Sequence, residues 1–505
     1  MANIHSFSAF GFEGAVINVE AEIRRGIPAV DIVGLADGAV KESRERMKSA
    51  IRNSGFEFPT ERVLLCMSPC DMKKDGTGFD LPIALSILAA KPDYPVEHHE
   101  DIMVLGELEL SGHTRPCNAI YPALCEAVAN GIKYAIIPDD CESASPDGIT
   151  VLKARCLSEA YDLMLKVDKG EVEQNPEHEP AEHGIEFCEA DKDNNLDTVE
   201  GNVGLKYAMA VAAAGGHHLL AYGRPGCGKT AVLQHMPELL PNLTEDEIPS
   251  VTRVHSIAGL MSNSEKMKKW RPFRMPHQTV SIEGMCGGGV SCRPGEISLA
   301  HNGVLFLDEA AEFKSSVLQI MRVPLENGYI TLSRAGRSTT YPAKFQLIMA
   351  TNPCPCGNFG SKDKVCLCSA KSIEMYWRKF PRPLIDKIAI RIRCDGDDVC
   401  AKDVSLGELR RRIRMAYDRQ LARQGKRNQD LSLGEISEMI KFSAGADLVL
   451  KSQAESNGLS ETAVATVKKL ARTLADMYDE IESPVVSREC VEEALKLRDR
   501  VPDFI

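Results

Sequence analysis

The sequence predicts an α/β protein built from three folded parts. In the first part, about 165 residues long, apolar strand-like runs alternate with amphipathic helical runs. Buried strands and helices alternate again after residue 195, a pattern typical of a mostly parallel sheet. From residue 396 onward the strand signals stop and only helical patterns remain. The length of 505 residues agrees with about three domains of roughly 150 residues each.

The composition is that of an ordinary folded protein. Hydrophobic residues make up 44% of the chain and charged residues 26%, which excludes collagen-like, coiled-coil and largely disordered chains. No run reaches the roughly 18 apolar residues that a membrane helix needs, so we expect no membrane association. The N-terminus lacks a basic segment leading into an apolar run, and the 17 cysteines fit reduced thiols. We therefore expect a cytoplasmic protein.

The net charge of −12 is concentrated in one segment. Between Asp168 and Glu200 the chain carries twelve acidic residues and two lysines. The remainder is nearly neutral, so the acidity is no argument against a nucleic-acid partner. Residues 167–195 have few apolar side chains and predict a solvated acidic linker. This linker divides the chain into domains at 1–166, 196–395 and 396–505.

The first domain contains signals for strands and helices in alternation, which predicts an α/β or α+β fold. A glycine, Gly55, ends the first helical pattern. Strands are expected at 15–23, 62–69 and 133–138, and helices at 39–55, 79–90 and 121–131.

A glycine-rich motif, GRPGCGKT, lies between an apolar strand and a helical run, which is where a phosphate-binding loop belongs. Its glycines let backbone N–H groups turn toward phosphate oxygens. Lys229 would contact the β and γ phosphates, and Thr230 would bind Mg²⁺. The motif predicts a site for ATP and Mg²⁺ made by Gly223, Arg224, Pro225, Gly226, Cys227, Gly228, Lys229 and Thr230.

Two further buried strands end in polar residues suited to nucleotide hydrolysis. The first, VLFLDE, ends in Asp308, which would hold Mg²⁺, and in Glu309, which would polarise a water for attack on the γ-phosphate. The second, FQLIMATNP, ends in Asn352, which would orient that water. The predicted catalytic set is therefore Lys229, Asp308, Glu309 and Asn352.

Four cysteines are clustered directly after Asn352. Cys354 and Cys356 are separated by a short loop from Cys366 and Cys368. Four thiolates brought together by one turn suit a tetrahedral Zn²⁺, so we expect a structural zinc site. An iron–sulfur cluster and four reduced, unbound thiols are the alternatives.

Taken together, these motifs resemble those of the magnesium-chelatase-like AAA+ ATPases of the ComM/YifB family. The resemblance extends over nearly the whole chain. It implies an AAA+ P-loop core with a C-terminal helical lid, ATP hydrolysis, and a homo-oligomeric ring, usually a hexamer. It also implies a DNA helicase that promotes branch migration. The motifs that carry it are GRPGCGKT, RPFRMPHQT, RPGEISLAHNGVLFLDE, LENGYITLSRAG and ATNPCPCG.

Basic residues in two core inserts are candidates for contact with single-stranded or branched DNA. The segment YITLSRAGRSTTYPAKF alternates like a hairpin and places Arg334 and Arg337 at its tip. Arg274 lies in the other insert. An arginine offers a phosphate both charge and a bidentate fork. The alternative is a hairpin whose arginines pair with a neighbouring subunit. The basic stretch Arg410–Arg427 suits a solvated or subunit-facing helix as well as it suits DNA.

The first domain resembles the proteolytic domain of Lon through KKDGTGFDLPIA and the segment that begins GELELSGHTRPCNAIYPAL. Lon-type cleavage needs a serine nucleophile and a lysine base. Here Gly78 stands at the serine position and Tyr121 at the lysine position. We therefore expect a Lon-protease-like domain without proteolytic activity.

Two cationic positions depart from the family pattern. Lys387 stands where an arginine acting on the neighbouring subunit is expected, and Arg382 or Arg391 could substitute for it. Thr462 stands at the expected C-terminal sensor arginine. An arginine finger contributes about 10³–10⁵ in rate, so these departures favour slow turnover. A nucleotide-dependent remodelling factor with weak ATPase activity is therefore the alternative to a DNA motor, ahead of a chelatase subunit or a Lon-type protease.

Overall fold

The computed structural model describes most of the chain between residues 2 and 498. Among the described residues, no helix is both long enough and apolar enough to cross a membrane. The segments outside the described residues within that span are 35–37, 71–73, 75–77, 94–95, 97–100, 143–144, 174–183, 262–266, 335–336, 362–363, 395–403 and 479–483.

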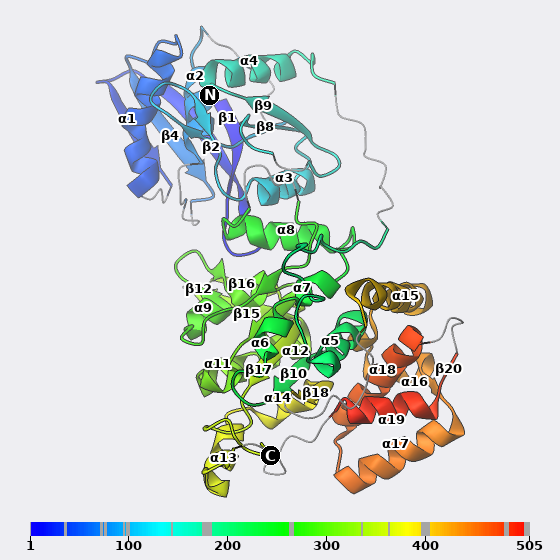
Figure 1. The fold of residues 1–505 in the computed structure, drawn as a ribbon. Coiled ribbons are helices and arrows are strands. Elements are labelled where there is room, and N and C mark those ends of the chain that lie inside the picture. The colour runs from blue at the N-terminus through cyan, green and yellow to red at the C-terminus, as the bar shows by residue number, and fades with distance from the viewer. Residues whose placement is uncertain are drawn as a thin grey trace.

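The N-terminal domain is a seven-stranded mixed sheet with helices packed on it (Figure 1). Antiparallel pairs join β1 to β2 and β2 to β4, whereas the other neighbours in the sheet run parallel. Its order is β3 (Ala29–Val33), β4 (Arg62–Ser68), β2 (Ala15–Arg24), β1 (Ala2–Ser8), β5 (Ile102–Val104), β8 (Tyr134–Pro138) and β9 (Thr150–Ala154). The helices are α1 (Gly38–Asn53), α2 (Asp80–Ala89), α3 (Ile120–Ala129) and α4 (Leu157–Asp168), and a short ribbon pairs β6 (Glu107–Leu108) with β7 (Thr114–Arg115).

Helix α2 is the centre of this domain, and every one of its ten residues is buried. Its sequence, DLPIALSILA, is apolar on all sides, which is the pattern of a helix covered all round. The one charged residue, Asp80, is satisfied by Arg46 of α1 at 3.1 Å. A buried carboxylate without such a partner would be strongly destabilising.

The central domain is a five-stranded sheet in which every neighbouring pair is parallel. Its three inner strands are fully buried and mostly apolar, as expected for a parallel sheet covered on both faces, whereas the two edge strands are largely half-buried. The order is β11 (Phe273–Arg274), β14 (Val304–Leu307), β17 (Gln346–Thr351), β10 (Leu219–Tyr222) and β18 (Ile390–Arg393).

Short helices and two ribbons surround this sheet. The ribbons pair β12 (Gly287–Gly288) with β13 (Arg293–Pro294), and β15 (Tyr329–Arg334) with β16 (Arg337–Pro342). The helices are α5 (Val203–Gly215), α6 (Lys229–Leu233), α7 (Met236–Leu239), α8 (Ile248–Ile257), α9 (Ile282–Cys286), α10 (Glu296–Leu299), α11 (Ser315–Ile320), α12 (Arg322–Asn327), α13 (Ala370–Trp377) and α14 (Arg382–Lys387), with a 3₁₀ turn at Ala310–Glu312.

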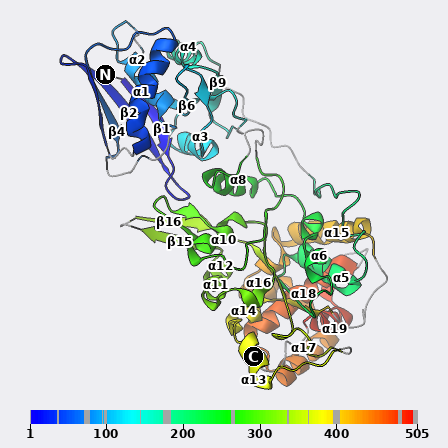
Figure 2. The same cartoon turned by 60° about the vertical axis from the view of Figure 1, so that its left-hand side comes forward.

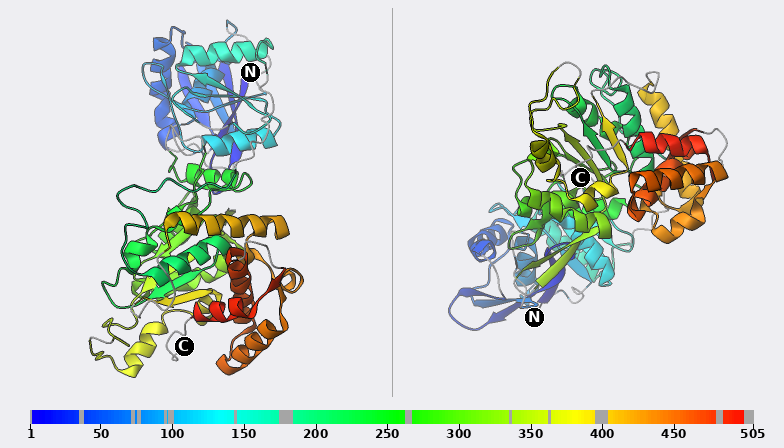
Figure 3. Two further views of the ribbon diagram at one scale, coloured as in Figure 1. Left: turned by 45° about the vertical axis from the view of Figure 1, so that its right-hand side comes forward. Right: turned by 90° about the horizontal axis from the view of Figure 1, so that it is seen from below.

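The C-terminal part is helical, as the sequence predicts, and it shares a hydrophobic core with the sheet domain. Leu409 of α15 and Leu470 of α18 belong to the same cluster as Met209 of α5 and Ile348 of β17. The helices therefore pack against one side of the central domain, away from the N-terminal domain (Figure 3). They are α15 (Leu406–Gln424), α16 (Leu433–Met439), α17 (Ala444–Asn457), α18 (Glu461–Tyr478) and α19 (Arg488–Lys496), with a 3₁₀ turn at Asn428–Asp430 and a small ribbon of β19 (Lys441–Phe442) and β20 (Val485–Val486).

The acidic segment predicted as a linker differs from that expectation in its second half. Helix α4 ends at Asp168, and residues 174–183 lie outside the described residues. Beyond them the chain docks on the central domain, where Phe187 pairs with Pro241 in an isolated bridge. The guanidinium groups of Arg410 and Arg414 lie 5.5 and 5.6 Å from the Phe187 ring. Neighbouring residues add to this docking, since the Glu186 N–H donates to Asn242 Oδ1 at 2.9 Å and Arg410 donates to the carbonyl of Cys188 at 2.9 Å. Composition does not reveal such contacts.

The turn between β1 and β2 anchors the N-terminal domain to the central one (Figure 2). The backbone N–H of Phe12 donates to Thr339 Oγ1 of β16 at 2.9 Å, and its ring lies 5.9 Å from that of Tyr341. Arg253 of α8 donates to the carbonyls of Phe12 at 2.8 Å and Glu13 at 2.7 Å. The N-terminal domain therefore contacts the base of the β15–β16 hairpin directly.

Substituting Arg253→Ala should loosen this anchor without unfolding either domain. The variant loses two charge-assisted hydrogen bonds, so we expect amide hydrogen exchange in residues 10–14 to accelerate about tenfold or more. Hydrogen exchange followed by mass spectrometry measures it. Arg24→Ala, which removes an exposed arginine bonded to Glu22, is the control and should leave that exchange unchanged. Equal rates in both variants would contradict the anchoring role.

Candidate nucleotide site

The phosphate loop lies where the sequence places it, between β10 and α6. Gly226 and Gly228 adopt left-handed backbone conformations, with φ of +79° and +86°, that other residues rarely reach. Lys229 is buried, and its Nζ donates to the carbonyls of Gly223 at 2.7 Å and Arg224 at 2.9 Å. The ammonium is thus held over the loop by carbonyl groups that phosphate oxygens would replace.

The predicted magnesium ligands are in contact. Thr230 Oγ1 donates to Asp308 Oδ1 at 2.9 Å, although the two residues are 78 positions apart. The same carboxylate oxygen accepts the backbone N–H of Glu309 at 3.0 Å. A hydroxyl and a carboxylate at the end of a phosphate loop are the oxygen ligands that Mg²⁺ takes beside a nucleoside triphosphate.

Glu309 stands in a strained conformation at the exposed end of β14. Its φ is +49° and its ψ is +46°, the left-handed region that is uncommon for residues other than glycine. Strain of this kind is concentrated at functional sites, where the surrounding structure enforces it. The arrangement holds the carboxylate in solvent directly after the Mg²⁺ ligand Asp308, as a water-activating base requires.

Asn352 directly follows β17. The register between β17 and β10 places it beside the phosphate loop. Thr351 pairs with Tyr222, the last residue of β10. Met349 pairs with Leu307, one residue before Asp308. The three predicted polar ends therefore meet at one edge of the sheet.

A second asparagine supports the loop and was missed in the sequence. Asn202 Nδ2 donates to the carbonyl of Cys227 at 2.9 Å. Asn202 has a φ of +51° and directly precedes α5. Its pairing with residue 227 depends on how α5 packs, so the only local signal was an asparagine before an apolar helix.

The four clustered cysteines converge. Every pair of Sγ atoms lies within 4.8 Å, and Cys354, Cys356 and Cys366 are separated by 3.4 to 3.7 Å. Tetrahedral zinc with Zn–S bonds of about 2.3 Å requires sulfur atoms roughly 3.8 Å apart, so the donor set fits that ion. A hydrogen bond from the backbone N–H of Asn358 lowers the pKa of Cys356 to about 6, which favours the thiolate that metals bind.

The predicted hairpin is present, and it projects from the core on the side away from the C-terminal helices (Figure 2). Its turn, Ala335–Gly336, lies outside the described residues, but Arg334 and Arg337 face each other as the last paired residues. The side chain of Arg334 is exposed. Arg274 is placed differently, because Glu296 holds its guanidinium at 2.7 and 2.8 Å at the edge of the central sheet.

The basic helix α15 is largely satisfied within the chain. Arg410 donates to the carbonyls of Glu238 and Cys188, and Arg411 and Arg412 bind Glu408. Arg423 bonds both carboxylate oxygens of the buried Asp476. Arg410 and Arg423 thus join α15 to other elements of the chain, and Arg411 and Arg412 pair within the helix.

Lys387 and Thr462 stand at the two altered cationic positions, and Arg382 and Arg391 are the candidates to replace the missing arginine. Lys387 ends α14, with its Nζ 3.9 Å from Glu326 of α12, and burial lowers its pKa. Arg391 donates to the carbonyl of Ile385, and burial lowers its pKa to about 10. Arg382 is exposed at the start of α14, and Thr462 is exposed in the first turn of α18. Arg382 is thus the freer of the two proposed substitutes.

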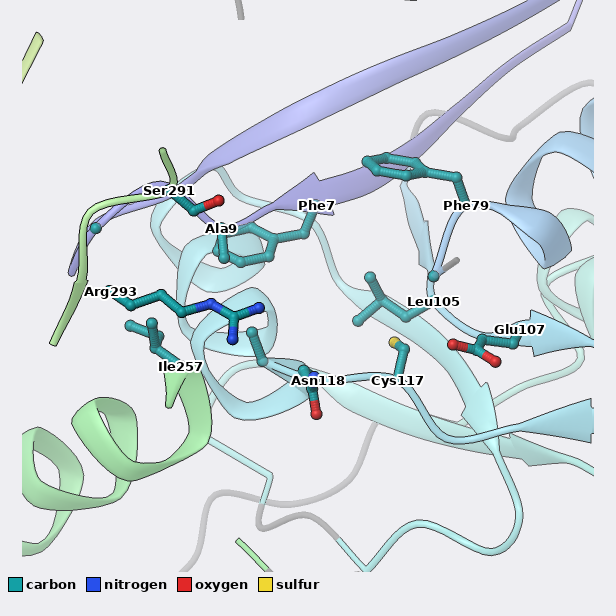
Figure 4. Close-up of a pocket in the computed structure, with 13 residues that line it drawn as sticks. Phe7, Ala9, Phe79, Leu105, Glu107, Cys117, Asn118, Ile257, Ser291 and Arg293 are labelled. Carbon is teal, nitrogen blue, oxygen red and sulfur yellow. The ribbon is translucent and has the colours of Figure 1, made fainter. Parts of the chain in front are cut away.

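A cavity of about 210 Å³ lies beside Gly78, the position expected for a Lon-type serine. It lies where this domain meets the core, and Arg293 from the core points into it opposite Glu107 (Figure 4). A Cβ built on Gly78 would lie 3.2 Å from Cys117 Sγ, so a thiol occupies the space beside the absent nucleophile. Burial raises the pKa of Cys117 to about 12 and also raises that of Tyr121, which leaves both groups protonated. The positions expected for the Lon-type serine and lysine thus hold a glycine and a protonated tyrosine, which cannot act as nucleophile and base.

Replacing Glu309→Gln should abolish hydrolysis while sparing nucleotide binding. The amide keeps the shape but cannot take a proton, so we expect turnover to fall by about 10²–10⁴-fold. Phosphate release and the affinity for a fluorescent ADP analogue measure the two effects. Lys229→Ala is the comparison, because it should weaken binding itself. Normal turnover in Glu309→Gln would contradict the assigned base.

Replacing Gly78→Ser should not restore proteolysis. The added hydroxyl would meet Cys117, and Tyr121 would supply no basic amine. We expect ATP-dependent casein digestion at background level in both the wild type and the variant, with a Lon protease as the positive control. Digestion by either form would contradict the loss of protease chemistry.

This chain is similar to known proteins over nearly its whole length. Family models described as magnesium chelatase subunit ChlI match residues 19–141 and 195–399, and one for its C-terminal part matches residues 405–498. The YifB protein of Escherichia coli is 34% identical over 98% of this chain and 96% of its own. The competence protein ComM of Haemophilus influenzae is 32% identical over 95% of this chain and 94% of its own.

The N-terminal domain is also similar to part of a Lon protease. A Lon protease of Geobacter metallireducens is 25% identical over 167 residues, which is 30% of this chain and 20% of that protein. The family models span residues 195–399, which include the phosphate loop, and the helical C-terminal residues 405–498, and the relatives span nearly the whole chain. The chain therefore belongs to the magnesium-chelatase-like AAA+ ATPases of the ComM/YifB family.

Proposed function

We propose that this protein is a ring-forming, ATP-hydrolysing motor that acts on single-stranded or branched DNA as a helicase or branch-migration factor. The observation that carries the ATPase part is the contact between Thr230 and Asp308 at 2.9 Å. It brings the proposed Mg²⁺ ligands together next to Lys229 and Glu309, so the phosphate-loop lysine, the metal ligands and the candidate base all come from one chain.

The DNA part is supported by the β15–β16 hairpin. It ends in Arg334 and Arg337, projects from the core, and is held at its base by the buried Tyr341. The side chain of Arg334 is exposed, and an exposed arginine on a hairpin that is anchored at its base suits a sugar–phosphate backbone. The name of the relative ComM, a competence protein, points to DNA uptake or recombination as the setting.

The ring is supported by the AAA+ architecture and by the cationic positions. Lys387 and Arg382 lie on α14, and Arg382 is exposed. An AAA+ site is completed by a cation from the neighbouring subunit, so a homo-oligomer, with six subunits as the expected number, would bring one of these groups to the γ-phosphate. We further propose that Cys354, Cys356, Cys366 and Cys368 hold a structural Zn²⁺, because their spacing fits tetrahedral sulfur coordination.

The second candidate is a nucleotide-dependent remodelling factor with weak hydrolysis and no unwinding activity. The specific observations that favour it are Thr462 in the first turn of α18 and the pairing of Lys387 with Glu326 of its own chain. Thr462 brings no positive charge to the transferring phosphate, and Lys387 offers a point charge without the planar fork of an arginine.

The two candidates differ in their response to DNA. For the motor, we expect ATP hydrolysis to be stimulated by single-stranded DNA or a four-way junction, and the stimulation to vanish in Lys229→Ala. In Arg334→Ala, the DNA concentration for half-maximal stimulation should rise about tenfold and the salt dependence should become shallower. Arg488→Ala, which removes an exposed charge on α19, is the control. Nucleotide-dependent rings without any DNA stimulation would support the remodelling factor instead.

A further inference from the structure

The cysteine-bearing segment, residues 353–368, is packed directly against the phosphate loop. A Cβ built on Gly357 would lie 2.4 Å from Cδ of Pro225, which is the third residue of GRPGCGKT. Such a distance leaves no room for any side chain at position 357. Gly357 also has a φ of +77°, and its N–H donates to the carbonyl of Cys354 at 3.0 Å. The position of the first cysteine pair is therefore transmitted to Pro225 through van der Waals contact.

A second contact fixes the same segment beside the strand that carries the phosphate loop. Arg393 Nη2, at the end of β18, donates to the carbonyl of Phe359 at 3.1 Å. Arg393 pairs with Tyr222, the residue that directly precedes the loop. The segment thus touches both the phosphate loop and the strand next to β10.

The described residues of this segment are held by apolar packing of Phe359, Cys366 and Cys368 against the core and by a hydrogen bond at its beginning. Its beginning is fixed, because the buried Trp377 donates from Nε1 to the carbonyl of Pro353 at 3.0 Å. Farther along, Val365 and Leu367 are 80% and 90% exposed, so they add almost no apolar burial. The four Sγ atoms lie within 4.8 Å of one another, so a metal bound there would join the two halves of the segment directly. A metal bound by four cysteines contributes folding energy outright, and losing it frees such a loop.

We propose that the metal held by these four cysteines controls nucleotide binding by fixing Gly357 against Pro225. With the metal bound, the segment supports the phosphate loop in the conformation that receives a phosphate chain. Without it, the segment separates from Pro225 and the nucleotide binds more weakly. This inference rests on the structural Zn²⁺ proposed above, and it adds that the ATPase responds to zinc supply through a site outside the nucleotide pocket.

Three variants of the full-length protein test this. Cys366→Ser removes one metal ligand. Gly357→Ala keeps all four cysteines but places a methyl group against Pro225. Gly425→Ala, at the end of α15, is the matched control, since its φ of +69° imposes similar strain and no atom lies within 4 Å of the added carbon. Zinc per chain is measured by mass spectrometry of the digested protein, and affinity by titration with a fluorescent ADP analogue in constant Mg²⁺.

We expect zinc in the wild type, in Gly357→Ala and in Gly425→Ala, and its loss in Cys366→Ser. The dissociation constant for the ADP analogue should rise about tenfold in Cys366→Ser and in Gly357→Ala, and not in Gly425→Ala. Thermal melting shows whether a variant is folded. If Cys366→Ser unfolds, the nucleotide affinity of Gly357→Ala decides whether the control mechanism holds.

The outcomes separate the two proposals. Zinc-free wild-type protein would overturn the zinc assignment and the control mechanism together. Zinc in the wild type with unchanged affinity in Gly357→Ala would overturn the control mechanism alone and leave zinc as a structural ion. If nucleotide affinity falls equally in Gly357→Ala and Gly425→Ala, backbone strain is the cause. That result would also overturn the control mechanism.

Discussion

The parallel register of β10, β14 and β17 is the constraint on which the nucleotide site depends. Because all three strands run in one direction, the residues that follow them emerge at the same edge of the sheet. This brings Thr230 within hydrogen-bond distance of Asp308 across 78 positions and places Asn352 beside the phosphate loop. The strands are buried on both faces, so a slip in register would disrupt the core and the site together.

Two peripheral structures are mechanically joined to this centre. The β1–β2 turn of the N-terminal domain contacts Arg253 and the base of the β15–β16 hairpin, and the cysteine segment contacts Pro225. Neither contact involves the chemistry of hydrolysis. The first contact connects the N-terminal domain to the hairpin that carries the proposed DNA-binding tip. The second connects the cysteine segment to the phosphate loop. The remnant of a protease fold therefore has a mechanical use that needs no nucleophile.

Much of the fold and most of the site could be predicted from the sequence. Local residue patterns predict these parts, namely the apolar runs of β10, β14 and β17, the glycines of the phosphate loop and the cysteine spacing. The docking of Phe187, the support of Cys227 by Asn202 and the pairing of Arg274 with Glu296 could not be predicted. Those contacts join residues between 22 and 54 positions apart, and their partners are chosen by packing alone.

The sequence by itself determined the class of each domain, the identity of the phosphate loop and the loss of the protease residues at Gly78 and Tyr121, because these depend on local residue type and order. Only the tertiary structure decided which charges remain free. It pairs Arg274 and Lys387 within the chain, exposes Arg334 and Arg382, and brings the cysteine segment against Pro225. The physical reason is that a charge or a contact surface is defined by its neighbours in space, and a linear pattern does not contain those neighbours.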